Sequence, residues 1–278
     1  MIIIKLMGGL GNQMFQYAIG KQLSIKYNKE LKLDKTFLIC RNLGDNFTYR
    51  DFDLDIFDID LSIIENVTIN NDWEVIEEPY NTPDLTNVIN NANFNKTIYL
   101  NGFFQKEIYF KNIRKLLLKD FKITINDYNI KILENEILSL NSICINIRRG
   151  DYVTNQNTNN FHGFYGNEFV NEAVLEITKT IENPMFYIFS DDIDWCVENI
   201  KIDFPHFFVS HIFKGDRFSS YLKLMSSCKH FIIPNSTFAW WAAWLNENEG
   251  KIVYAPKKWF NVQHMNTEYL IPNEWNKL

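Results

Sequence analysis

The sequence lacks an excess of positive charge. Its 278 residues include 28 lysines and arginines against 34 aspartates and glutamates, which gives a formal net charge of −6. Binding nucleic acid along a broad surface needs a positive footprint, so this composition argues against that class of function. An anionic ligand would have to be held by a few well-placed local groups.

Long apolar runs and paired cysteines are also missing. The richest apolar stretch, residues 231–245, is interrupted at Pro234 and falls short of the roughly 18 apolar residues of a membrane span. Residues 1–7 are apolar but lack the basic start of a secretion signal. The cysteines form no CxxC pair, which predicts free thiols in a reducing cytoplasm at Cys40, Cys144, Cys196 and Cys228.

Strand and helix patterns alternate along the chain. Short apolar runs predict strands at 2–5, 31–33, 98–100, 142–147, 185–189, 207–209, 230–233 and 252–254. Helical patterns lie between them at 13–27, 109–121, 169–181, 218–228 and 238–246. Such alternation is typical of parallel, doubly wound α/β sheets. We expect two Rossmann-like domains, 1–135 and 136–278, that are joined near 125–141 and face a cleft, with loops and short helices over 37–95.

A glycine-rich turn follows the first strand. Gly8, Gly9 and Gly11 precede a helix, and glycines there let backbone N–H groups approach an anion at the helix N-terminus. A tight strand-to-helix turn is the structural alternative. A dinucleotide fingerprint, supported by Asp34 after the next strand, is the rival function, and Met14 in place of the third glycine weakens it.

Three further polar segments follow predicted strands in the second half. Arg148-Arg149-Gly150-Asp151 offers guanidinium groups that match phosphate oxygens, or a surface ion pair with Asp151. Ser190-Asp191-Asp192 offers carboxylates for a nucleoside or a metal, or a helix cap. Asn235-Ser236-Thr237 offers a phosphate site, a helix cap, or both. Because ligands bind at the carboxyl ends of parallel strands, the three together predict a nucleotide-diphosphate site.

Several ordered stretches together resemble the bacterial α-1,2-fucosyltransferases of glycosyltransferase family 11. The resemblance rests on GGLGNQMFQYA (8–18), IRRGDY (147–152), FSDD (189–192) and NSTFAWWAAWLN (235–246). The segments GFFQ (102–105) and 50–57 also resemble the family, so the likeness spans nearly the whole chain.

The resemblance implies a metal-independent transferase of the GT-B type, with no cofactor. It would move L-fucose, with inversion, from GDP-fucose to the 2-hydroxyl of a terminal β-galactoside in polysaccharide or oligosaccharide synthesis. A lipid-linked acceptor would bring the protein to the inner face of the membrane. The predicted donor-binding residues are Gly11, Asn12, Gln13, Asn146, Arg148, Arg149, Asp191, Asp192, Asn235, Ser236, Thr237 and Phe238.

Catalytic roles are expected for two of these segment residues. Arg148 would stabilise the charge that grows on the departing diphosphate. Asp151 is the first candidate for a base, with orientation of the arginines as its alternative role.

Two positions depart from the family pattern. Asn146 stands where the family has a histidine that helps to hold guanine, and Tyr221 stands where it often has an acid. The nucleoside contacts therefore stay open at this stage, as does a third possible function, a non-catalytic carbohydrate-binding protein suggested by the tryptophans.

Overall fold

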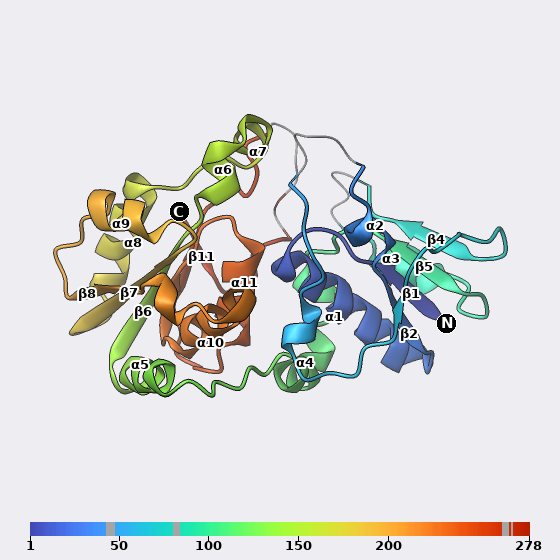
Figure 1. Cartoon of the computed structure of the whole chain (residues 1–278), viewed down its shortest axis with the longest axis horizontal. Coiled ribbons are helices and arrows are strands. Elements are labelled where there is room, and N and C mark those ends of the chain that lie inside the picture. Colours follow the sequence, from blue (N-terminus) through green and yellow to red (C-terminus); the bar gives the residue numbers. More distant parts are fainter. Residues whose placement is uncertain (43–47, 80–83, 263–266, 268) are drawn as a thin grey trace. The chain divides into compact units, whose positions relative to one another are not determined.

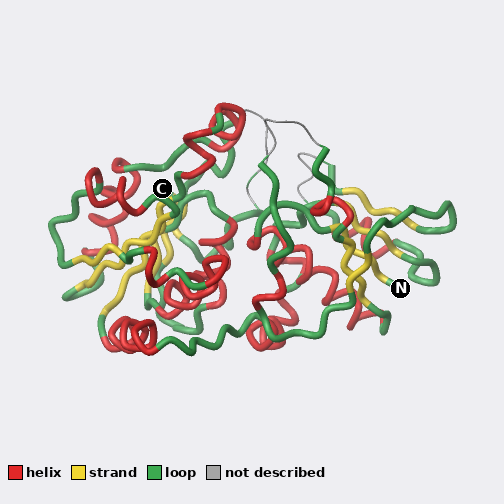
Figure 2. Tube along the Cα trace, in the orientation of Figure 1, coloured by secondary structure: helices red, strands yellow, loops and turns green. Residues whose placement is uncertain are grey.

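The computed structural model describes residues 1–42, 48–79, 84–262, 267 and 269–278, without the side chain of Asp151. The chain forms two compact units. One comprises Met1–Lys122 with His264–Ile271, and the other comprises Ile123–Gln263 with Pro272–Leu278. Figure 1 labels their elements and Figure 2 separates helices from strands.

The first unit contains a parallel sheet in the order β3-β2-β1-β5-β4. Ile2, Ile3 and Ile4 in its middle strand are fully buried, as expected for a strand covered on both faces. Its strands are β1 (Ile2–Lys5), β2 (Leu31–Asp34), β3 (Ile63–Ile64), β4 (Glu74–Glu77) and β5 (Ile98–Asn101). Its helices are α1 (Leu10–Tyr27), α2 (Thr36–Ile39), α3 (Thr86–Asn91) and α4 (Arg114–Asp120), with 3-10 turns at Leu54–Ile56, Glu107–Tyr109 and Lys111–Ile113.

The second unit contains a parallel sheet in the order β11-β10-β9-β6-β7-β8. Its strands are β6 (Asn141–Ile147), β7 (Pro184–Ser190), β8 (His206–Phe208), β9 (His230–Ile232), β10 (Val253–Ala255) and β11 (Asn276–Lys277). Its helices are α5 (Tyr128–Ser139), α6 (Gly150–Thr154), α7 (Gln156–His162), α8 (Asn167–Thr178), α9 (Ile193–Asn199), α10 (Ser219–Ser227) and α11 (Thr237–Leu245). Two 3-10 turns lie at His211–Phe213 and Asp216–Phe218.

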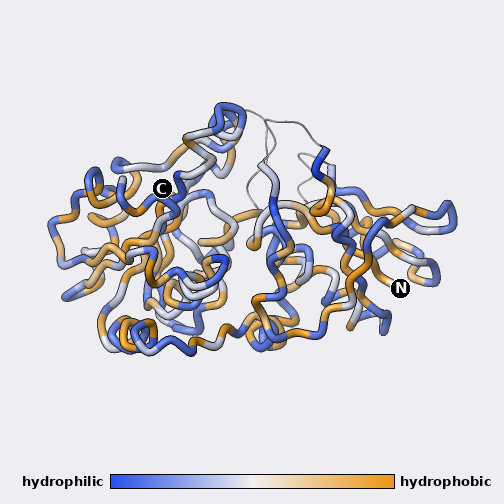
Figure 3. The backbone as a smooth tube through the Cα atoms, in the orientation of Figure 1, coloured by the Kyte–Doolittle hydropathy of each residue, from blue (hydrophilic) through white to orange (hydrophobic). Residues whose placement is uncertain are grey.

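Side-chain alternation along β6 sorts its residues between two faces. Ile143, Ile145 and Ile147 pack in one core with α8 and α9. Asn146 points to the opposite face, where its amide nitrogen lies 3.9 Å from Met225 of α10. Because successive strand residues alternate between faces, the apolar pattern of β6 also fixes where Asn146 points. Figure 3 shows hydrophobic residues along the strands and hydrophilic ones in the outer loops.

The predicted parallel α/β architecture is confirmed, and some predicted boundaries are corrected. The division falls at Lys122/Ile123 rather than at 135/136, because α5 packs on β6 and α10 of the second unit. The region 37–95, read as loops and short helices, also contributes β3 and β4. All four cysteines are free thiols, as predicted. None of the helices in the described ranges is both long and apolar enough to cross a bilayer.

Candidate functional site

Three neighbouring strands of the second sheet end beside one another. β6 lies between β9 and β7, and Ile147 of β6 pairs with Ser190 of β7. This register brings the residues after β6, Arg148 to Gly150, next to Asp191 and Asp192 after β7. The turn after β9 leads through Asn235 and Ser236 into α11 on the other side of β6.

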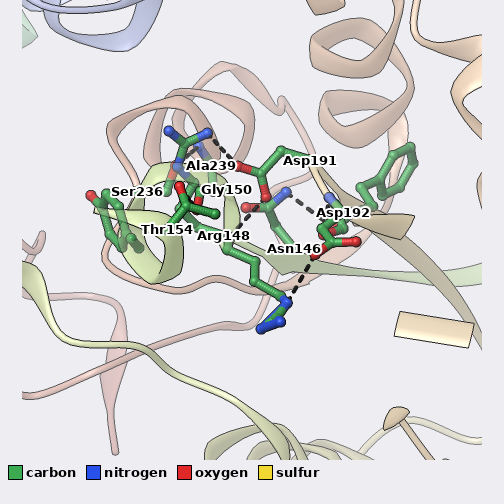
Figure 4. A network of polar contacts seen from close by, with 12 residues as sticks. Asn146, Arg148, Gly150, Thr154, Asp191, Asp192, Ser236 and Ala239 are labelled. Atoms are coloured by element: carbon green, nitrogen blue, oxygen red, sulfur yellow. Dashed lines mark hydrogen bonds and ion pairs between the residues drawn. The ribbon is translucent and has the colours of Figure 1, made fainter. Parts of the chain in front are cut away.

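Two arginines and two aspartates form a linked set of ion pairs at this edge. The Nη1 atom of Arg148 lies 2.7 Å from Oδ2 of Asp191, and the Nε atom of Arg149 lies 2.9 Å from Oδ2 of Asp192. The backbone N–H of Arg149 donates to Oδ1 of Asp191 over 2.8 Å. Figure 4 shows Arg148, Asp191 and Asp192 in this network. A Cβ on Gly150 would lie 2.5 Å from Asp191 Oδ2, so a side chain here would displace this carboxylate.

Both carboxylates are therefore occupied by arginines. Asp192 is also the predicted helix cap, since its Oδ1 accepts from the N–H of Trp195 in α9 over 3.4 Å. The nucleoside contact that the resemblance implies for Asp191 or Asp192 stays a prediction. Arg149 also lies over the ring of Trp195, with its guanidinium carbon 4.2 Å from the centroid. These contacts orient the two cations, since charged hydrogen bonds and cation–π contacts are directional.

The Asn235 segment joins several parts of the second unit. Asn235 is 1% exposed, and its amide nitrogen donates to the carbonyls of His162 and Trp259 over 2.7 and 2.9 Å. Its own carbonyl accepts from the hydroxyl of Tyr152 over 3.1 Å. Its Oδ1 accepts no hydrogen bond from the residues described. The amide nitrogen of Asn235 therefore has a structural role, while its Oδ1 is a buried hydrogen-bond acceptor without a partner among the described residues.

Ser236 caps α11, as the sequence suggested. Its hydroxyl oxygen accepts from the backbone N–H of Ala239 over 3.4 Å. Thr237 and Phe238 follow at the first helical positions and remain partly exposed. First-turn N–H groups of a helix have no carbonyl partner within it. The start of α11 thus offers two backbone donors and one end of a helix dipole beside Arg148.

Two other predicted residues of this edge have different outcomes. Asn146 is 9% exposed, and its amide nitrogen donates to the carbonyl of Phe189 over 3.3 Å. This hydrogen bond ties Asn146 to β7, and its role in donor binding stays a prediction. Asp151 lies in α6, and its side chain, with the predicted base role, is outside the described part of the structure.

In the first unit, the glycine turn before α1 is built largely by Gln13. This side chain is fully buried; its Nε2 donates to the carbonyls of Gly8 and Asp51, and its Oε1 accepts from the N–H of Asp53. The predicted donor contact of Gln13 is replaced by a structural cross-link. Gly8 has φ 76°, a left-handed conformation that favours glycine.

Gly11 and Asn12 lie in the first turn of α1, which begins at Leu10. Asn12 is partly exposed, and its Oδ1 accepts from Gln105 Nε2 over 2.9 Å, while Gly11 is buried. The sequence reasoning missed the nearby Arg50, whose Cδ lies 3.9 Å from the position of a Cβ on Gly9. The sequence did contain a signal for Arg50, because this residue is the first of segment 50–57, which resembles the family.

The carboxylate of Asp34 is unavailable to a dinucleotide ribose. It is 1% exposed, its Oδ2 accepts from the hydroxyl of Tyr99 over 2.7 Å, and its Oδ1 accepts from the N–H of Thr36. Burial and this carboxylate raise the pKa of Tyr99, which keeps the phenol protonated as the donor. The sequence feature that supported an oxidoreductase is therefore a structural hydrogen-bond pair.

His211 is a further polar group at the carboxyl edge that the motifs did not reveal. Its Nε2 donates to the carbonyl of Ser190 over 3.0 Å, and its ring lies 5.9 Å from that of Phe218. Arg217 and Phe218 both have left-handed backbone conformations, with φ of 45° and 61°, a strained arrangement that is common at ligand sites. Tyr221 is buried, and its hydroxyl donates to the carbonyl of Val209.

Other titratable groups near the edge are not placed for chemistry. Burial raises the pKa of the Cys196 thiol to about 11, so this thiol is protonated and unreactive at neutral pH. Among the described residues, no three His, Cys, Asp or Glu side chains are grouped so that they could hold a metal ion.

Residues 1–278 match the family described as Glycosyl transferase family 11. The Escherichia coli protein named alpha-1,2-colitosyltransferase is 30% identical, with 100% of this chain and 98% of that protein covered. The E. coli O-antigen biosynthesis glycosyltransferase WbnK is 34% identical, with 92% and 93% covered.

More distant similarities reach animals and plants. A Caenorhabditis elegans galactoside 2-alpha-L-fucosyltransferase is 26% identical, with 57% of this chain and 46% of that protein covered. Among solved structures, FUT1 of Arabidopsis thaliana in complex with GDP is 10% identical, covers 93% of this chain and 71% of that chain, and has a TM-score of 0.49.

Proposed function

The chain belongs to glycosyl transferase family 11, and from this premise we propose that it transfers L-fucose from GDP-fucose to the 2-hydroxyl of a terminal β-galactoside. The observation that carries the proposal is the position of Arg148. Its guanidinium follows β6 at the carboxyl edge of the second sheet and is oriented by Asp191 at 2.7 Å. It also lies 5.3 Å from the ring of Tyr152, whose hydroxyl donates to the carbonyl of Asn235 just before α11. A diphosphate needs such a cation with nearby N–H donors.

The proposed reaction needs charge stabilisation at the leaving group. As the bond from the fucose anomeric carbon to GDP breaks, negative charge grows on the diphosphate, and the acceptor hydroxyl attacks from the opposite face with inversion. Arg148 and the first-turn N–H groups of Thr237 and Phe238 would bind that charge. Within the cluster the arginine charges are balanced by Asp191 and Asp192. Because a guanidinium carries five N–H donors, Arg148 can bind a phosphate oxygen while its Nη1 atom stays paired with Asp191.

The other groups take supporting roles in this proposal. Arg149, held by Asp192 and Trp195, would position the turn or contact the second phosphate. The nucleoside would lie near Ser190. There His211, which is hydrogen-bonded to Ser190, would supply a polar contact, and Phe218 would supply an aromatic ring. Asn12 and Gly11 stay predicted donor contacts in the first unit, where Gln105 donates to the Oδ1 of Asn12. Asp151 remains the proposed base for the acceptor hydroxyl, with the departing diphosphate as the alternative.

A second donor is favoured by one specific observation. The relative that is similar over 100% of this chain is named an alpha-1,2-colitosyltransferase. Colitose is L-fucose without its 3-hydroxyl, so both sugars would be transferred by the same chemistry. The donors differ in one hydrogen-bonding group, and a site built to bind such a group discriminates strongly against the analogue that lacks it.

Turnover with both donors tests the proposal. Purified protein should release GDP from GDP-fucose when lactose is added, and NMR should show an α-1,2 linkage to galactose. GDP-colitose should react roughly 10⁴-fold less efficiently in kcat/KM, a ratio typical of a substrate that lacks a bound hydroxyl; the reverse preference would assign colitose. Arg148→Ala should lower kcat/KM by about two orders of magnitude or more with an unchanged melting temperature.

Two results would contradict the proposal. Without GDP release from either donor, a carbohydrate-binding role would replace the transferase. Near-normal turnover of the Arg148→Ala variant would remove Arg148 from the diphosphate site. Asp151→Asn separates the base alternatives, because loss of a base should reduce transfer more than hydrolysis of the donor.

A further inference from the structure

A row of lysines lies on the outside of α4 in the first unit. The 3-10 turn Lys111–Ile113 leads directly into α4, and Lys111, Lys115, Lys119 and Lys122 are all exposed. Lys115 and Lys119 are four residues apart in α4 and so lie on the same side of the helix, while Lys111 precedes α4 in the 3-10 turn and Lys122 follows its last residues. We call these four side chains the lysine row.

The opposite side of this segment is anchored in the core. Leu117 is fully buried and Phe121 is 3% exposed. The ring of Phe121 lies 5.5 Å from Tyr17 of α1 and 4.9 Å from Phe57. Because these anchors fix the rotation of the helix, the lysine row is held outward as a defined surface.

The row is not neutralised by its neighbours. Within the described part of the chain, no carboxylate forms an ion pair with these four lysines. The carboxylate of Asp120, inside the same helix, instead accepts a hydrogen bond from Tyr17 over 2.8 Å. On the neighbouring α1, the amine of Lys21 lies 5.9 Å from the Tyr17 ring, and Lys21 lines a hollow together with Glu30 and Asp60.

The charge of this segment opposes that of the whole chain. Residues 111–122 contain five basic residues and one acidic residue, in a chain whose net charge is −6. Apolar side chains accompany the lysines: Ile108 is 46% exposed, and Ile113, Leu116 and Leu118 are partly exposed. Lysines mixed with apolar side chains on one surface fit the interface of an anionic bilayer.

From the lysine row and its apolar neighbours we propose that the α4 surface docks the protein on a membrane of anionic lipids. The charges attract the headgroups, while Ile108 and Leu118 reach the boundary of the acyl region. A nucleic acid is the less favoured occupant, because the lysine row has no exposed aromatic ring for stacking on bases. The inference does not depend on which sugar is transferred.

Co-sedimentation with vesicles tests this surface. The full chain should bind vesicles of phosphatidylcholine with phosphatidylglycerol and should bind pure phosphatidylcholine vesicles weakly. Replacing the four lysines (Lys111→Gln, Lys115→Gln, Lys119→Gln, Lys122→Gln) should lower the partition coefficient by nearly three orders of magnitude, since each lysine near an anionic surface contributes about fivefold. Raising the salt from about 0.1 M to about 1 M should have a similar effect.

A matched control removes the same charge elsewhere. Lys96→Gln, Lys131→Gln, Lys201→Gln and Lys258→Gln together replace four other exposed lysines and should reduce binding far less. Thermal melting checks that both variants fold. If the fourfold lysine-row variant does not fold, the double variant Lys115→Glu with Lys119→Glu replaces it in the same vesicle assay. Equal vesicle binding by wild type and lysine-row variant overturns the proposal, as does absence of wild-type binding. Tighter binding to a mixed-sequence RNA than to vesicles at equal salt also overturns it.

Discussion

At the scale of single residues, the central feature is the pairing of Arg148 with Asp191. The sequence showed two arginines and two aspartates after separate strands, but their pairing depends on the register that sets Ile147 beside Ser190. Gln13 could not be assigned from sequence for the same reason, because its partners Asp51 and Asp53 lie in an irregular segment. Local motifs therefore predicted which residues lie at the strand ends, whereas the hydrogen-bond and ion-pair partners of these residues depend on long-range contacts.

Gly150→Ala should separate site geometry from stability. The new methyl group would lie 2.5 Å from Asp191 Oδ2 and would push the carboxylate away from both arginines. We expect turnover to fall at least tenfold, as charged hydrogen bonds are typically worth about 1.5–3 kcal/mol, while the melting temperature falls by only a few degrees.

Gly250→Ala is the control for this change. The nearest atom to a Cβ on Gly250 is 4.0 Å away, in Asn248, so turnover should be unchanged. Wild-type turnover in Gly150→Ala would show that the exact position of Asp191 is unimportant.

At the scale of elements, strongly patterned segments were predictable and weakly patterned ones were not. β1 lies at the predicted residues because three consecutive isoleucines are buried on both faces. β3 and β4 are short edge strands within polar sequence, so they carry little pattern. α5 was missed although Ile130, Leu133 and Ile137 are buried at helical spacing after the Asp127 cap, because that stretch was read as a connection.

The β9–β10 pairing should weaken in acid through His230. Its Nδ1 accepts from the N–H of Ile252 over 3.1 Å, and burial lowers the pKa of this histidine. The folded state therefore binds the proton less readily than the unfolded state, whose histidine pKa is about 6.5. Stability should be fully present above about pH 6.5 and should fall as the pH drops below that value.

His230→Asn tests this contribution, because an amide oxygen can accept in place of Nδ1 without taking up a proton. The loss of melting temperature between about pH 7.5 and about pH 5.5 should be smaller in this variant than in wild type. His206→Asn, at an exposed position in β8, is the matched control. An unchanged pH slope in His230→Asn would assign the acid sensitivity to other groups.

At the scale of the whole molecule, a net acidic chain concentrates its cations at defined places. Arg148 and Arg149 lie at the carboxyl edge of the second sheet, and the lysine row lies on α4 of the first unit. The first cations are paired and oriented, which suits recognition of one anion with defined geometry. The second are exposed and unpaired by the described carboxylates, which suits a diffuse anionic surface.

Calorimetric titration of GDP tests the central claim, that Arg148 holds the diphosphate of a GDP-sugar, most directly. Loss of a charged hydrogen bond should raise the Kd at least tenfold in Arg148→Ala. Arg41→Ala, which removes an exposed arginine paired with Asp51 in the first unit, should leave the Kd unchanged. An Arg148→Ala protein that binds GDP as tightly as wild type would contradict the account.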